Sequence, residues 1–133
     1  GSKRGFYNQR TGKVSMVESS KKVKPWREAV KHAILEVGPE PIEGPASVRL
    51  TFYMPRPKSH YRTGKRAGEL KDSAPAYPTT RPDCDKLARS TLDALTESGW
   101  LAQDDAQIVF LLAEKRYADS RPPGAVIFVE PMA

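Results

Sequence analysis

Five aspartates lie close together in the stretch TTRPDCDKLARSTLDALTESGWLAQDDAQIV, residues 79–109, of a chain whose net charge is +6. Closely spaced carboxylates repel one another unless a cation lies between them, and a site built only from oxygen ligands suits Mg²⁺ or Mn²⁺. The pattern places two of them at the start of a predicted helix and two before the following strand, so we expect both ends to converge on one metal. The five are Asp83, Asp85, Asp93, Asp104 and Asp105.

Each aspartate also has a structural interpretation when it is taken singly. Asp83 can accept hydrogen bonds from the first amides of the helix as its N-cap. Asp93 can form an ion pair with Arg89 one helical turn earlier, and Asp104 with Asp105 can form a turn before a strand. The prediction of a metal site therefore depends on the five aspartates together and not on any single one of them.

A magnesium site on a basic protein indicates phosphoryl chemistry. The metal would polarise a scissile phosphate and lower the pKa of a bound water, while Lys and Arg side chains neutralise the developing charge. Hydrolysis of a phosphodiester bond is the reaction class that this combination predicts.

Charge is unevenly divided along the chain. Residues 1–82 carry 17 Lys and Arg against 7 Asp and Glu, whereas residues 83–133 carry 5 against 9. A basic half of this kind favours a polyanionic partner, most commonly a nucleic acid. The alternative is a set of solvated lysines with no partner.

A long aperiodic segment at about 56–82 is the strongest candidate for that contact. Its basic residues are interspersed with Tyr61 and Tyr77, whose rings could stack on bases. We expect this loop to contact nucleic-acid phosphates, with three lysines near residue 22 as the next candidates. The predicted nucleic-acid-binding residues are Arg56, Lys58, Arg62, Lys65, Arg66, Lys71, Arg81, Lys21, Lys22 and Lys24.

The 133 residues fit one domain that must position these groups. Alternating or helical apolar spacing predicts an α+β fold, a small mixed β-sheet with two covering helices in a single domain over residues 1–133. The 106–117 segment is apolar enough to be a central strand. The expected elements are a hairpin at 5–17, a helix at 18–38, a strand at 47–55, a helix at 83–99, and strands at 106–117 and 125–130.

Composition excludes several other classes of protein. No apolar run approaches the roughly 20 residues needed to span a bilayer, so we expect no membrane contact and a soluble, cytoplasmic protein. The single cysteine, Cys84, excludes a disulfide framework or a cysteine-rich zinc site. Apolar strands in so small a domain also favour a homodimer, with Phe110, Leu111, Val126 and Phe128 as candidate interface residues.

The same stretch resembles the RusA family of Holliday-junction resolvases, which are common in phages and prophages. The resemblance is carried by RPDCDKL, by LDAL in the helix and by DDAQI at the strand start, with further agreement at KPWREAVKHA and in the strand at 47–55. It implies a magnesium-dependent endodeoxyribonuclease that acts in a bacterial or phage-infected cell. Such an enzyme binds branched DNA as a homodimer and resolves four-way junctions by paired symmetric nicks.

The resemblance also implies roles for individual residues. Asp83, Asp85 and Asp105 match the metal-binding carboxylates of the family, and Asp104 is the acidic neighbour. The catalytic lysine of the family falls on Arg89, and the asparagine after the second aspartate is Lys86. Arg89 keeps a positive charge but cannot share a proton, so its role would be electrostatic, and Lys86 is a second candidate.

Two other interpretations stay open on the sequence alone. A non-catalytic nucleic-acid-binding module would bind DNA whether or not magnesium is present. A structural or interaction protein would use its basic half to contact an acidic partner and would show no salt-sensitive affinity for DNA.

Overall fold

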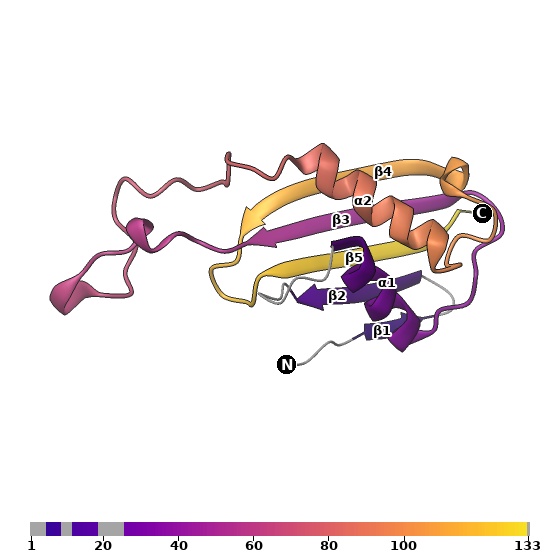
Figure 1. Ribbon diagram of the computed structural model, residues 1–133, viewed down its shortest axis with the longest axis horizontal. Coiled ribbons are helices and arrows are strands. Elements are labelled where there is room, and N and C mark those ends of the chain that lie inside the picture. Colours follow the sequence, from indigo (N-terminus) through magenta and orange to yellow (C-terminus); the bar gives the residue numbers. More distant parts are fainter. Residues whose placement is uncertain (1–4, 9–11, 19–25, 133) are drawn as a thin grey trace.

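A five-stranded mixed sheet carries both helices on one face in the computed structural model of the chain (Figure 1). The structure describes residues 5–8, 12–18 and 26–132, with the backbone alone before residue 26. The strand order is β1-β2-β5-β3-β4, and β3 with β4 is the parallel pair. The elements are β1 (Gly5–Asn8), β2 (Gly12–Glu18), α1 (Trp26–Val37), β3 (Ala46–Met54), α2 (Cys84–Glu97), β4 (Ile108–Tyr117) and β5 (Gly124–Pro131).

The core lies between this sheet and the two helices. Alternate residues of β3 and β5 are buried because side chains on a strand point to opposite faces, and Leu50 lies opposite Ile127 in the register. Val30 and Ile34 of α1 and Leu95 of α2 cover this face. The predicted α+β fold with two covering helices is therefore confirmed.

Both helices end where the sequence predicts. Gly38 and Gly99 follow α1 and α2 with φ of +63° and +84°, a conformation that favours glycine and stops a helix. The described part of α1 begins at Trp26, so the predicted start of that helix, together with Lys21, Lys22 and Lys24, lies outside the described residues. Neither helix has the length and hydropathy to cross a membrane in the part of the chain that the structure describes.

The position of β4 differs from the prediction, because β4 is an edge strand and not a central one. Among the described strands it pairs with β3 alone. Four consecutive apolar side chains on it are between 44% and 63% exposed, namely Val109, Phe110, Leu111 and Leu112. A continuous apolar run is typical of a strand buried on both faces, so this single chain leaves β4 incompletely covered.

Residues 55–82, here called the arm, project beyond the sheet between β3 and α2 (Figure 1). The expected aperiodic loop has local order, with 3₁₀ turns at Lys58–His60 and Gly64–Arg66. Tyr61 and Leu70 form a β-bridge, the Arg62 amide donates to the Glu69 carbonyl at 2.8 Å, and the Lys71 amide donates to the His60 carbonyl at 2.9 Å. The two sides of the arm are thus held together as a narrow hairpin.

Candidate active site

The start of α2 presents two carboxylates to solvent. Asp83 occupies the predicted N-cap position, but its side chain makes no capping hydrogen bond, so the expected side-chain cap is wrong. Its Oδ2 atom lies 3.9 Å from Nζ of Lys86, and the side chain is 52% exposed. Asp85 is exposed and has no hydrogen bond or ion pair with any described residue. Two carboxylates two residues apart are therefore available to bind a cation.

Asp105 lies at the opposite end of α2. The helix has 14 residues, so its axis is about 21 Å long at 1.5 Å per residue. Asp105 opens the short turn Asp105–Gln107 that leads into β4, and β4 then runs back toward the arm (Figure 1). Within one chain the expected convergence of the three aspartates is therefore wrong. Across the described residues, no three His, Cys, Asp or Glu side chains come close enough to hold a metal.

Asp104 has a structural task in the same turn. Its Oδ1 atom accepts the Ala106 amide at 2.8 Å, while Oε1 of Gln107 accepts the Asp104 amide at 3.2 Å in a reciprocal capping box. Nε2 of Gln107 also donates to the carbonyls of Ile42 at 2.7 Å and Gly44 at 2.9 Å. These bonds fix the backbone that presents Asp105, whose own side chain is exposed.

A shallow hollow of about 270 Å³ lies between α1 and the polar side of α2. Lys86 and Arg89 line it one turn beyond Asp83 and Asp85, so two cations stand beside the acid pair. The expected ion pair between Arg89 and Asp93 is absent from the described structure, because Asp93 instead lies 3.7 Å from Arg27 of α1. Arg89 therefore faces a hollow that could receive a phosphate.

Comparison with known proteins decides the family. The sequence profile described as "Endodeoxyribonuclease RusA" matches residues 1–130. The chain belongs to the RusA family. It is also 33% identical over 111 residues to YqaN of Bacillus subtilis strain 168, described as an uncharacterized protein, and the match covers 83% of this chain and 75% of YqaN. Membership in the RusA family indicates an endodeoxyribonuclease that acts on branched DNA junctions.

In this RusA-family chain, the sequence interpretation missed Lys115 on β4. Its Nζ atom donates to the carbonyls of Thr80 at 2.8 Å and Pro82 at 3.0 Å, the residues just before Asp83. In the register Lys115 lies beside Phe52, whose side chain points to the helix-covered face. Side chains alternate between the two faces of a strand, and this alternation places Lys115 on the helix-covered face. A charged residue at such a position could have indicated its special role from the sequence.

Arg56 also differs from its predicted role as a phosphate contact. Its side chain is only 4% exposed, and its Nε and Nη2 atoms bond the Asp119 carboxylate at 2.6 and 3.3 Å. Nη1 donates to the Pro75 carbonyl at 2.8 Å, and the guanidinium lies 4.0 Å from the Tyr117 ring centroid. The hydrogen bond with Asp119 raises the pKa of Arg56, so the charge persists despite burial. Arg56 therefore anchors the base of the arm to the β4–β5 connection.

Removing this anchor should loosen the arm of the RusA-family chain. We expect Arg56→Met to lower the free energy of unfolding by about 2 kcal/mol, because several hydrogen bonds of a buried guanidinium are lost while Asp119 stays partly hydrated. Chymotrypsin should then cut the arm at Tyr61, Leu70 or Tyr77 faster than in the parent protein. Lys58→Met is the matched control, since Lys58 is exposed on the same arm. Equal cleavage rates in the two variants would contradict the anchoring role.

Proposed function

We propose that the chain is a Mg²⁺-dependent endonuclease that resolves four-way DNA junctions by paired nicks in the bacterial or phage-infected cytoplasm. The observation that carries the proposal is the exposed pair Asp83 and Asp85, which begins α2 where the basic arm returns to the sheet of a RusA-family chain. Oxygen ligands without protein partners suit Mg²⁺, and Mn²⁺ has the same preference. When bound, the metal would polarise the scissile phosphate and activate water.

A single copy of the chain supplies only part of the ligand set. Asp83 and Asp85 lie at one end of α2 and Asp105 at the other, so a site with all three needs Asp105 from a second copy. The exposed outer edge of β4 offers the surface for such a dimer, because its apolar side chains are left uncovered by the described part of one chain.

The direction of β4 supports this arrangement. Two β4 edges related by a twofold axis pair antiparallel, so the first residues of one strand lie beside the last residues of the other. Asp105 precedes the first residue of β4, whereas Lys115, near its end, bonds the backbone just before Asp83. In such a dimer, Asp105 of one copy approaches Asp83 and Asp85 of the other, and two identical sites result.

The surrounding cations have separate tasks in the proposed reaction. Arg89 would stabilise the charge that develops on the phosphate. Lys86 lies 3.9 Å from Asp83 and can share a proton, so it is the candidate for protonating the leaving oxygen. The arm cations Lys58, Arg62, Lys65, Arg66, Lys71 and Arg81 attract the DNA backbone and hold the substrate across the site.

Incubation with a synthetic four-way junction tests the function directly. We expect symmetric nicks in two strands of like polarity with Mg²⁺, no nicks with a chelator, and little cleavage of a linear duplex of matched sequence. The second candidate, a non-catalytic DNA-binding module, predicts equal junction binding in both conditions and no product. Intact junction after long incubation with Mg²⁺ would therefore favour that module over the nuclease.

A further inference from the structure

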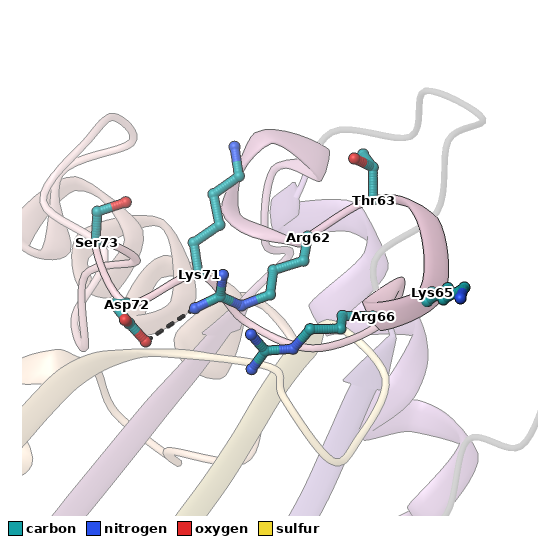
Figure 2. Close-up of a pocket in the computed structure, with 7 residues that line it drawn as sticks. All are labelled: Arg62, Thr63, Lys65, Arg66, Lys71, Asp72 and Ser73. Atoms are coloured by element: carbon teal, nitrogen blue, oxygen red, sulfur yellow. Dashed lines mark hydrogen bonds and ion pairs between the residues drawn. The ribbon is translucent and has the colours of Figure 1, made fainter.

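The tip of the arm encloses an open hollow of about 570 Å³ that is lined by basic side chains. Arg62, Arg66, Lys65 and Lys71 supply the basic lining, and Figure 2 shows the guanidinium groups of Arg62 and Arg66 on the side of Asp72, while the side chains of Lys71 and Lys65 extend away from them. The hydroxyl groups of Thr63 and Ser73 complete the lining with Asp72.

The charges in this hollow are unbalanced. Four cations line it against one carboxylate, Asp72, which accepts a hydrogen bond from Nη2 of Arg62 at 2.9 Å. Nε of Arg62 is buried without an acceptor among the described residues, so this guanidinium would reach an anion in the hollow through its Nη atoms. Arg66 pairs with Glu69 at 3.0 Å, outside the lining. The hollow therefore offers donors and positive charge that an anion of phosphate size can use.

The backbone beneath the hollow is held by specific bonds. Amide donation from Arg62 to Glu69 and from Lys71 to His60 joins the two sides of the arm on either flank of the Tyr61–Leu70 bridge. Arg62 and Lys71 are themselves members of these bonded pairs, so their side chains leave the hairpin from fixed positions. This arrangement distinguishes the hollow from a set of lysines scattered over a loop.

We propose that this hollow is a subsite for one backbone phosphate of the DNA substrate, separate from the phosphate that is cleaved. The inference rests on the proposed function, because it takes DNA as the substrate. The hollow lies toward the end of the arm that is remote from the sheet, whereas Asp83 and Asp85 lie where the arm joins α2 (Figure 1). The chain thus holds its substrate at two distant points, and Arg56 at the base of the arm fixes their separation.

Binding of a four-way junction in the presence of chelator tests the subsite without interference from cleavage. We expect the double variant R62Q/K71Q to bind about tenfold more weakly, because two charge-assisted contacts to one phosphate are lost. The matched control K58Q/R81Q removes two exposed arm cations that do not line the hollow, and it should lose less affinity.

Uncharged methylphosphonate linkages locate the bound phosphate. A methylphosphonate at one position in the junction should weaken binding by the parent protein and by K58Q/R81Q. The same linkage should leave binding by R62Q/K71Q unchanged. Asp72→Asn should bind the unmodified junction about threefold more tightly, because a carboxylate that competes with the phosphate is removed.

Two results separate the subsite from the proposed nuclease. Equal loss of affinity in both double variants, or no single sensitive linkage, overturns the subsite even if Mg²⁺-dependent cleavage is normal. A single sensitive linkage that depends on Arg62 and Lys71 supports the subsite even if no cleavage occurs, and in that case the nuclease proposal fails alone.

Discussion

Asp85→Asn should reduce junction cleavage by roughly a hundredfold to a thousandfold, the scale observed when a charge-stabilising group is removed from an active site. Asp83→Asn and Asp105→Asn should have the same effect, because each removes a negatively charged ligand of the proposed metal. Binding in chelator should stay equal or become tighter, since less negative charge then faces the DNA. Initial rates of nicking on a labelled junction, measured over a range of Mg²⁺ concentrations, give the comparison.

Asp93→Asn is the matched control for this series. It removes the same charge from the same helix, but Asp93 lies 3.7 Å from Arg27 of α1 and outside the proposed ligand set, although it also lines the hollow beside Arg89. We expect its cleavage rate to stay within about threefold of the parent value, because an exposed ion pair contributes little. A cleavage rate for Asp85→Asn close to that of Asp93→Asn would exclude Asp85 from the metal site.

Mixing two inactive variants should restore cleavage if each site is shared between copies. A dimer of one D85N chain and one D105N chain keeps one intact site, because Asp83 and Asp85 of the second chain meet Asp105 of the first. Random exchange at equal concentrations makes half of the dimers mixed, so about a quarter of the sites are active. The product should be a single nick per junction, since the opposite site in each mixed dimer is inactive.

The control for complementation is a mixture of D83N and D85N. Both substitutions fall at the same end of α2, so every site in the mixed dimer lacks one ligand and no cleavage should return. If the metal site lay within one chain, neither mixture would cut. Restoration in the D83N and D85N mixture, or its absence in the D85N and D105N mixture, would refute the shared site.

The regular elements could be predicted because their apolar spacing has a physical cause. Val48, Leu50 and Phe52 alternate on β3, and Thr91 and Leu95 recur at helical spacing on α2, so each pattern marks the face that is buried. The two-residue spacing of Asp83 and Asp85 likewise predicted an acid pair at a helix start, which the structure contains.

Other features depend on tertiary contacts that leave no local signal. An apolar run such as Val109 to Leu112 looks the same whether the strand is covered by its own chain or by a second copy, so β4 was wrongly predicted as central. Arg56 looks like any arm cation until Asp119, 63 residues later, is seen to bond it. The separation of Asp105 from Asp85 follows from the direction in which β4 leaves its first turn, which the sequence does not specify.

Lys115 links the sheet edge to the acid pair mechanically. Its two hydrogen bonds tie β4 to the backbone at Thr80 and Pro82, so a shift of this edge strand is transmitted to Asp83. If two copies associate through β4, subunit association and magnesium binding share one coupling free energy. Magnesium should then raise the affinity between the subunits by the same factor by which dimerisation raises the affinity for magnesium. A free subunit would then be restrained from hydrolysing single DNA strands before its partner arrives.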